Sequence, residues 1–372
     1  MSGAGPPQGA KAPLGGSAVH EVTSVGAMSG DLQLRRQPRL VALSTALLLL
    51  SLFCLFLGAG VGSTGWDGLL AARHDAVAAQ ILWDIRLPRT LGAWAAGALL
   101  GLAGAVAQGL FRNPLADPYL LGSASGASLG LAVALALFSS AASSLIFSTN
   151  WLVRLGLTGF AFLGAVAGVL LTLMLARGVQ HTLRLLLAGV IVGVVLGAAR
   201  DLITIAVPNV LQAMQAFMLG NTSFIGWGSF SLMALVWLLC LLLASVLSRA
   251  LDGLSLGEAT ALSLGLPLAP MRVALVAVLA LATGTAVGQT GLIAFVGLAA
   301  PHLVRSVVQV RHRLLILLAS LTGGLLLMAA DVLARWVVAP QELPVGVLTA
   351  VLGGGYLLWL MHRRAGRMGA LS

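Results

Sequence analysis

The stretch LVALSTALLLLSLFCLFLGAG, residues 40–60, decides the class of fold, because it holds 21 residues without one charged side chain. A helix of about 20 apolar residues is long enough to cross the hydrocarbon core of a bilayer. Comparable runs recur along the whole chain. We therefore expect an all-α integral membrane protein with ten transmembrane helices, at about residues 40–60, 89–110, 119–139, 155–176, 185–207, 229–248, 271–288, 291–309, 314–333 and 345–362.

The composition supports this class and excludes others. Of the 372 residues 59% are hydrophobic and 9% are charged, against about 25% charged in ordinary soluble domains. A water-soluble enzyme of this size would lack the charge needed to cover its surface. A transmembrane β-barrel is also disfavoured, because its strands would alternate apolar and polar residues, whereas these apolar runs are continuous.

The charges indicate how the chain lies in the membrane. There are 21 Lys and Arg residues against 11 Asp and Glu residues. In the ten-span arrangement fifteen of the 21 basic residues fall on the side of the N-terminus, as the positive-inside rule requires of the cytoplasmic side. Both termini are then cytoplasmic. Basic residues in short loops, without interleaved aromatic residues, do not indicate nucleic-acid binding.

Three regions follow from these patterns. Residues 1–38, rich in Gly, Ala, Ser and Pro, are expected to form a disordered cytoplasmic tail. Residues 39–364 form the transmembrane domain, and residues 365–372 form a short cytoplasmic tail. The only lysine, Lys11, is not in a phosphate-binding P-loop motif. If the protein uses ATP, another chain must bind it.

Small residues recur at helical spacing in several of these runs. Glycine at every fourth position lets two helices approach closely, and in lipid such packing stabilises helix pairs. We expect packing within one subunit, while a dimer seam or the lining of a pathway stay open alternatives. The ladders are Gly122, Gly126 and Gly130; Gly189, Gly193 and Gly197; Gly97 and Gly101; and Gly284 and Gly288.

Five short motifs stand at the ends of the apolar runs. Two prolines close together in the second of them cannot continue a regular helix, so it marks a break at the membrane surface. The motifs are IRLPR at 85–89, NPLADP at 113–118, LSLGEA at 254–259 with LGLP at 264–267, GLIAFVGL at 291–298 with PHLVR at 301–305, and AD at 330–331 with Arg335 and ELPVG at 342–346.

In order and spacing these motifs resemble the FecCD-type permeases of bacterial ABC importers, over about residues 80–365. The resemblance implies a homodimeric permease of the cobalamin-importer type in the bacterial inner membrane. Its cargo would be a metal chelate: an iron-siderophore, haem or cobalamin. Two ABC ATPase subunits would dock on the cytoplasmic side and a periplasmic substrate-binding protein outside. The chain itself would bind no cofactor, since ATP and Mg²⁺ belong to the ATPase.

A cytoplasmic loop at about residues 250–268 is the expected contact with the ATPase. Ser255 and Glu258 have the spacing of a capping box, which predicts a helix of about nine residues, and Gly265 before Pro267 predicts its end. An ordinary interfacial helix is the alternative. By resemblance, the coupling residues are Ser255, Leu256, Gly257, Glu258, Ala259, Leu264 and Gly265.

Three of the arginines on the outer side, where the positive-inside rule disfavours them, stand in these motifs. By resemblance to the cobalamin importers, Arg86, Arg89 and Arg335 would pair with carboxylates of the binding protein. Helix-end anchoring is the simpler interpretation, and for Arg335 so is an i,i+4 pair with Asp331.

The resemblance also places a constriction at the inner end of the pathway. Asn113 and Leu115 match one side of it, and Thr182 and Leu183 match the other. Leu183 departs from the family pattern, which has a small polar residue there. The position of this gate is therefore expected, while its chemistry could differ.

Arg200 and Asp201 are unusual, because charges within a span are costly and commonly functional. Neighbouring residues point about 100° apart on a helix, so we expect no simple pair. Arg200 is a candidate pathway residue that would favour an anionic chelate such as an iron-siderophore or haem. An internal salt bridge and a position at the membrane rim are the alternatives.

Other functions are less well supported. An ion-coupled secondary transporter needs carboxylates near mid-membrane, and Asp201 is the one strong candidate. A membrane enzyme needs converging polar side chains, which the pattern does not supply. The six histidines do not cluster, so no metal site is expected, and His302 is assigned a structural hydrogen-bonding role.

Overall fold

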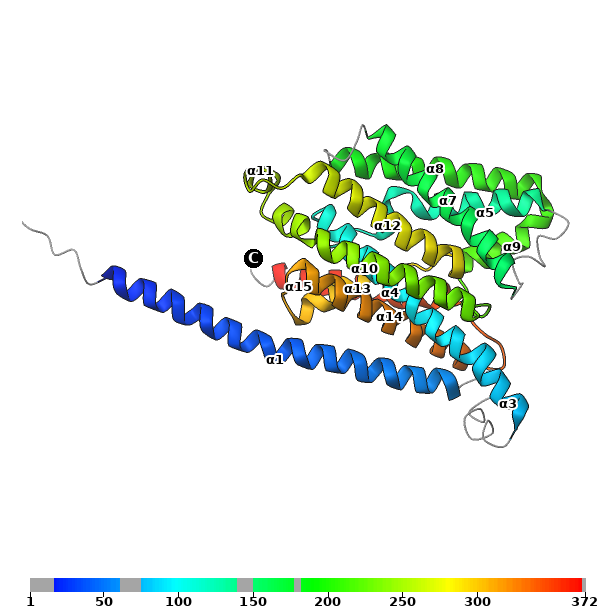
Figure 1. The fold of residues 1–372 in the computed structure, drawn as a ribbon, viewed down its shortest axis with the longest axis horizontal. Coiled ribbons are helices and arrows are strands. Elements are labelled where there is room, and N and C mark those ends of the chain that lie inside the picture. The colour runs from blue at the N-terminus through cyan, green and yellow to red at the C-terminus, as the bar shows by residue number, and fades with distance from the viewer. Residues whose placement is uncertain (1–16, 61–74, 139–149, 177–181, 370–372) are drawn as a thin grey trace, which may run out of the picture.

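Helices make up all the regular structure in the residues that the computed structural model describes, which are 17–60, 75–138, 150–176 and 182–369 (Figure 1). Most run side by side along one axis, as transmembrane helices do. Their bounds are α1 Ser17–Gly60, α3 Ala76–Ile81, η1 Leu82–Arg86, α4 Leu87–Leu110, η2 Pro118–Leu121, α5 Ser123–Leu137, α7 Trp151–Leu175, α8 Thr182–Ala206, α9 Pro208–Leu219, α10 Trp227–Ser255, α11 Glu258–Ser263, α12 Leu268–Thr290, α13 Val296–Val307, α14 His312–Trp336 and α15 Val345–Gly369.

The all-helical membrane fold is confirmed, but the count of ten full-length spans is not. Seven helices of the described residues are long and apolar enough to cross a bilayer, and two further apolar helices, Ser123–Leu137 and Val345–Trp359, are shorter. The expected span at 291–309 is reduced to α13, with 12 residues. Twelve residues rise about 18 Å, well short of a hydrocarbon core of about 30 Å. A left-handed glycine, Gly291, ends α12 and displaces the start of α13 to Val296.

The first helix begins earlier than expected. It starts at Ser17 and continues through Pro38, inside the segment that we expected to be a disordered tail. Residues 1–16 of that segment lie outside the described residues. The N-terminal part of α1 projects beyond the bundle (Figure 1).

The second long helix is the centre of the bundle. In the continuous helical segment Ala76–Leu110, 89% of an apolar stretch of 18 residues is buried. The corresponding share is 6% in α1 and 17% in each of α8 and α10. Helix α4 packs against α14, α10, α12 and α13. Helices α1, α8 and α10 therefore expose apolar faces that must meet lipid or another subunit.

Close backbone contacts explain the glycine ladders. A Cβ at Gly97 would lie 2.2 Å from the carbonyl oxygen of Gly323, which places α4 directly against α14. The same holds for Gly126 of α5, whose Cβ would lie 2.2 Å from the Gly164 oxygen of α7. Packing within one subunit is confirmed at these positions. Gly197 is the exception, because no atom lies within 4 Å of its Cβ position.

The two ends of the bundle carry different elements. Helix α11 lies at one end, and α3 and α9 lie at the opposite end (Figure 1). Helix α9 was not predicted. It begins at Pro208, a favourable first position of a helix, and buries one face through Val210, Ala213, Met214 and Phe217.

Candidate functional site

The predicted coupling segment forms a short helix, but its start differs from the prediction. Helix α10 continues to Ser255, whose hydroxyl donates back to the Asp252 carbonyl oxygen at 2.6 Å. The capping box with Glu258 is therefore wrong, because a serine can satisfy its hydroxyl inside a helix that continues. The break falls at Gly257, with φ 108° and ψ 150°, a conformation essentially restricted to glycine.

Helix α11 has six residues instead of the expected nine, and it ends as predicted at a left-handed Gly265. Ala261 is fully buried against the bundle, and Glu258 pairs with Arg272 of α12 at 2.9 Å. These contacts hold α11 in place.

The outward side of this segment is apolar. Leu256, Leu262 and Leu264 are 65%, 57% and 63% exposed, and Ala259 is exposed beside them. Leu262 lies in the short helix α11, and Leu256 and Leu264 flank it. Exposed leucines on a segment that is fixed to the bundle form a surface suited to a partner protein.

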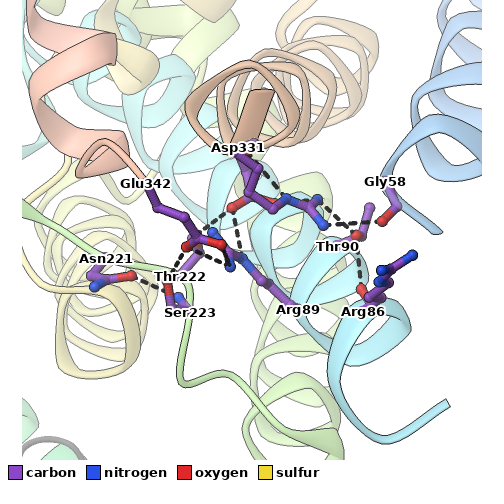
Figure 2. Close-up of polar contacts among 10 residues, drawn as sticks. Gly58, Arg86, Arg89, Thr90, Asn221, Thr222, Ser223, Asp331 and Glu342 are labelled. Carbon is purple, nitrogen blue, oxygen red and sulfur yellow. Dashed lines mark hydrogen bonds and ion pairs between the residues drawn. The ribbon is translucent and has the colours of Figure 1, made fainter. Parts of the chain in front are cut away.

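At the opposite end, charged side chains from distant parts of the chain form one buried network (Figure 2). Asp331 of α14 is fully buried and accepts from Arg89 of α4 at 3.1 Å and from Arg335 at 2.6 Å. The Thr222 hydroxyl donates to the same carboxylate at 2.5 Å. The buried carboxylate is thus paired with hydrogen-bond donors, which offsets the cost of burying its charge.

Glu342 extends the network into the loop that precedes α15. Its carboxylate accepts from the Arg89 guanidinium at 2.8 and 3.0 Å and from the Ser223 hydroxyl at 3.0 Å. Arg335 also donates to the Gly58 carbonyl oxygen of α1 at 3.0 Å and to the Thr90 hydroxyl at 3.1 Å. The network therefore joins α1, α4, α14 and two loops.

The three arginines that we predicted to dock the binding protein all have partners inside the chain. The i,i+4 pair of Arg335 with Asp331 is confirmed. Arg335 is 2% exposed and Arg89 is 7% exposed, so both guanidinium groups are engaged inside the chain, and docking through them stays a prediction that this geometry does not favour. Arg86 is partly exposed and donates to the carbonyl oxygens of Ala59 and Gly60 at 3.3 and 3.1 Å.

Three partners in this network were not predicted from the sequence: Glu342, Thr222 and Ser223. Charges at helix ends in an apolar chain must find partners, so Arg89 was a signal that another acidic group lay nearby. Arg89 and Glu342 are 253 positions apart in the chain, which gave no indication of which acidic group it was.

The predicted gate residues stand at helix ends. Asn113 follows α4 and accepts from the Leu115 amide at 2.9 Å, which closes a local turn. Leu115 is 51% exposed, and Leu183, in the first turn of α8, is 83% exposed. Thr182 begins α8, and its side chain lies outside the described residues. The role of these residues as a gate stays a prediction.

Arg200 and Asp201 form an ion pair, contrary to our expectation. Two guanidinium nitrogens of Arg200 lie 3.0 and 2.6 Å from one carboxylate oxygen of Asp201. The long arginine side chain can bend across the 100° between neighbouring positions, so the angle between the two positions on the helix does not prevent pairing. The Asp201 side chain is 61% exposed and that of Arg200 17%.

A metal-binding cluster is not found among the described residues, where no three His, Cys, Asp or Glu side chains come together. The His302 ring contacts Tyr356 edge to face, with ring centroids 5.9 Å apart.

Comparison with known proteins agrees with this architecture. The model of the FecCD transport family matches residues 46–363. The vitamin B12 import system permease proteins BtuC of Salmonella paratyphi A and Salmonella typhimurium are each 38% identical over 341 residues, covering 90% of this chain and 98% of theirs.

Solved structures show the same fold. An inward-facing conformation of a putative metal-chelate type ABC transporter superposes with a TM-score of 0.75 and 28% identity, covering 86% of this chain and 98% of that one. PsaBC from Streptococcus pneumoniae in complex with Fab gives a TM-score of 0.50 at 22% identity, covering 72% and 88% of the two chains, and supports the fold alone. With a family model that matches most of its length and relatives that align end to end, this chain belongs to the FecCD transport family.

Proposed function

We propose that this permease subunit imports a cobalt chelate of the vitamin B12 class. Membership of the family makes the chain the membrane-spanning subunit of an ABC importer for metal chelates. The observation that carries the proposal further is the 38% identity, over 90% of the chain, to permeases of vitamin B12 import. An anionic iron chelate is less favoured as cargo, because Asp201 neutralises the positive charge of Arg200 that would attract it.

Transport of labelled cargo tests this proposal. The permease, reconstituted with its ATPase and binding protein in vesicles, should accumulate cyanocobalamin only when ATP is supplied to the ATPase. A ferric siderophore and haem serve as competing cargos. ATP-dependent accumulation of either of these without cyanocobalamin would assign a different chelate, and accumulation driven by an ion gradient without ATP would indicate a secondary transporter.

The proposed assembly has two copies of this chain, two ATPase subunits and one binding protein. The end that carries α11 would face the cytoplasm and the ATPase. Support comes from the exposed leucines of that end and from the ion pair of Glu258 with Arg272, which fixes α11 to α12. Motion of the ATPase could then pass directly to a membrane helix.

Charges placed on the exposed leucines should uncouple the ATPase. In the double variant Leu262→Glu and Leu264→Glu, we expect about 30-fold weaker ATPase binding, which corresponds to about 1 kcal/mol lost at each of the two contact residues. Co-purification of the ATPase and cyanocobalamin uptake should both fall. Gly257→Leu should act similarly, because its backbone conformation excludes larger residues.

A matched control for this experiment is the double variant Val337→Glu and Val338→Glu, at the opposite end of the bundle. Val337 and Val338 are 58% and 42% exposed, so these substitutions add the same two charges without touching α11. Normal ATPase binding by the double leucine variant, or equal loss in the double valine variant, would contradict the assignment of this surface.

Arg86 is the most accessible of the arginines proposed to dock the binding protein. Charge reversal by Arg86→Glu should weaken association by about 2 kcal/mol, the lower end for a desolvated charge pair, and should reduce its dependence on salt. Surface plasmon resonance on permease in nanodiscs at two salt concentrations measures both effects. Asp84→Asn, an exposed neighbour of opposite charge, should leave association unchanged or strengthen it. If Arg86→Glu binds like the wild type, Arg86 only anchors the helix end through Ala59 and Gly60.

A further inference from the structure

A second polar site lies at the α11 end, outside the surfaces described above. It is a cavity of about 560 Å³ between the second half of α10 and the start of α14. Its lining is Leu242, Ser245, Val246, Ser248, Arg249, Asp252, Arg311 and Arg313. Three guanidinium groups therefore face one cavity beside a membrane helix.

The three arginines of this cavity are not engaged with other described residues. Neither a hydrogen bond nor an ion pair to any described residue is formed by the side chains of Arg249, Arg311 and Arg313, which are all exposed. The contrast with Arg89 and Arg335 is direct, because those two arginines are saturated by internal acceptors. Arginines that share a cavity and form no such contact are available for an anionic ligand.

The one carboxylate in the cavity does not neutralise them. Asp252 accepts from the backbone amide of His312 at 3.1 Å, and the Nδ1 atom of the same histidine lies 2.7 Å away. This pair ties the end of α10 to the first residue of α14 and so holds the two walls of the cavity together. The cavity keeps a net positive charge.

One wall of the cavity is apolar and continues into the membrane. Leu242 and Val246 are 58% and 73% exposed, and the exposed side chains of Leu235, Leu238 and Leu239 continue the same helix away from the arginines. From Leu235 to Val246 the helix rises about 16 Å. A ligand that fits this site has an anionic group at one end and a hydrocarbon chain at the other.

We propose that this cavity binds an anionic phospholipid, with its phosphate between Arg249, Arg311 and Arg313 and its acyl chains along α10. Guanidinium groups recognise phosphate oxygens in bidentate fashion, and basic cavities between membrane helices at a cytoplasmic surface bind lipid head groups in this way. An ATPase segment is a poorer occupant, because Leu242 and Val246 lie one to two helical turns into the span from Arg249, where a water-soluble partner does not reach.

Lipid binding to the purified permease with its ATPase tests the proposal. Native mass spectrometry would compare dioleoyl-phosphatidylglycerol with dioleoyl-phosphatidylcholine, which lacks net charge. We expect tighter binding of phosphatidylglycerol, and about 30-fold weaker binding in the double variant Arg311→Gln and Arg313→Gln, because each arginine near a membrane surface contributes about a factor of five. The double lysine variant keeps the charge without the planar fork and should bind with intermediate affinity.

The matched control removes two exposed charges elsewhere, by Arg39→Gln and Arg184→Gln. Equal weakening in this control would show that only overall charge matters and would overturn the site. So would equal binding of the two lipids, or full competition by inorganic phosphate, which would mark a site for the free anion. Loss of the ATPase with unchanged lipid binding would make these arginines an ATPase contact instead.

Discussion

Replacing Asp331 with asparagine is expected to lower the free energy of unfolding by about 3–5 kcal/mol, the cost of removing one partner from a buried ion pair. The Asp331 carboxylate is fully buried and accepts from Arg89, Arg335 and Thr222. Asparagine has nearly the same shape, so packing is kept while the negative charge is lost. Two buried guanidinium groups would then share the one remaining carboxylate, Glu342.

Titration of the purified permease with a denaturing detergent measures this loss. Asp201→Asn is the matched control, because it removes a carboxylate from an ion pair whose Asp201 side chain is 61% exposed. Exposed pairs contribute about 0–1 kcal/mol. A variant at Asp331 that is no less stable than the one at Asp201 would show that the network contributes little to folding.

Replacing Gly104 with alanine is expected to cost about 3 kcal/mol or more, at the upper end for overpacking in a well-packed core. A Cβ at this position would lie 1.7 Å from the carbonyl oxygen of Gly297 and 2.5 Å from its carbonyl carbon. Both atoms belong to the backbone at the start of α13, so no side-chain rotation can relieve the contact. Helices α4 and α13 would have to separate.

The control for this prediction is Gly197→Ala, in the interior of α8. No atom lies within 4 Å of its Cβ position, so alanine should stabilise the helix by about 0.5–1 kcal/mol through its higher helix propensity. The same unfolding titration, together with cyanocobalamin uptake, would compare the two variants. If the two substitutions had equal effects, helix propensity and not the contact with Gly297 would decide the result.

The membrane class could be read from the chain because it depends on local composition. Backbone N–H and C=O groups inside a bilayer have no water to bond with, so an apolar run such as 40–60 must form a helix there. The end of the coupling segment at Gly265 was predictable for the same reason, since a left-handed glycine is a local preference. The prediction at Ser255 was wrong for a local reason too. Ser255 could end one helix or begin the next, and in the structure it is the last residue of α10.

The lengths of the spans could not be obtained in this way. Helices α5 and α13 are shorter than their apolar runs because turns at Gly122 and Gly291 take residues from them. Helix α9 was missed because 12 residues of mixed polarity acquire a buried face only where the bundle supplies one. In these elements the packing partner, and not the apolar run, determines where a helix begins.

For the candidate sites, the sequence by itself determined which side chains carry charge and which of them stand at helix ends. It also determined the pair of Asp331 with Arg335, because residues four apart meet on any helix. Only the tertiary structure decided that Arg89 and Glu342, 253 residues apart, join them, and that Arg249, Arg311 and Arg313 are left facing a cavity. The reason is physical, because a buried charge is costly unless it is paired. Which charges are buried, and which lie close together, depends on how the helices pack, and local sequence does not determine that packing.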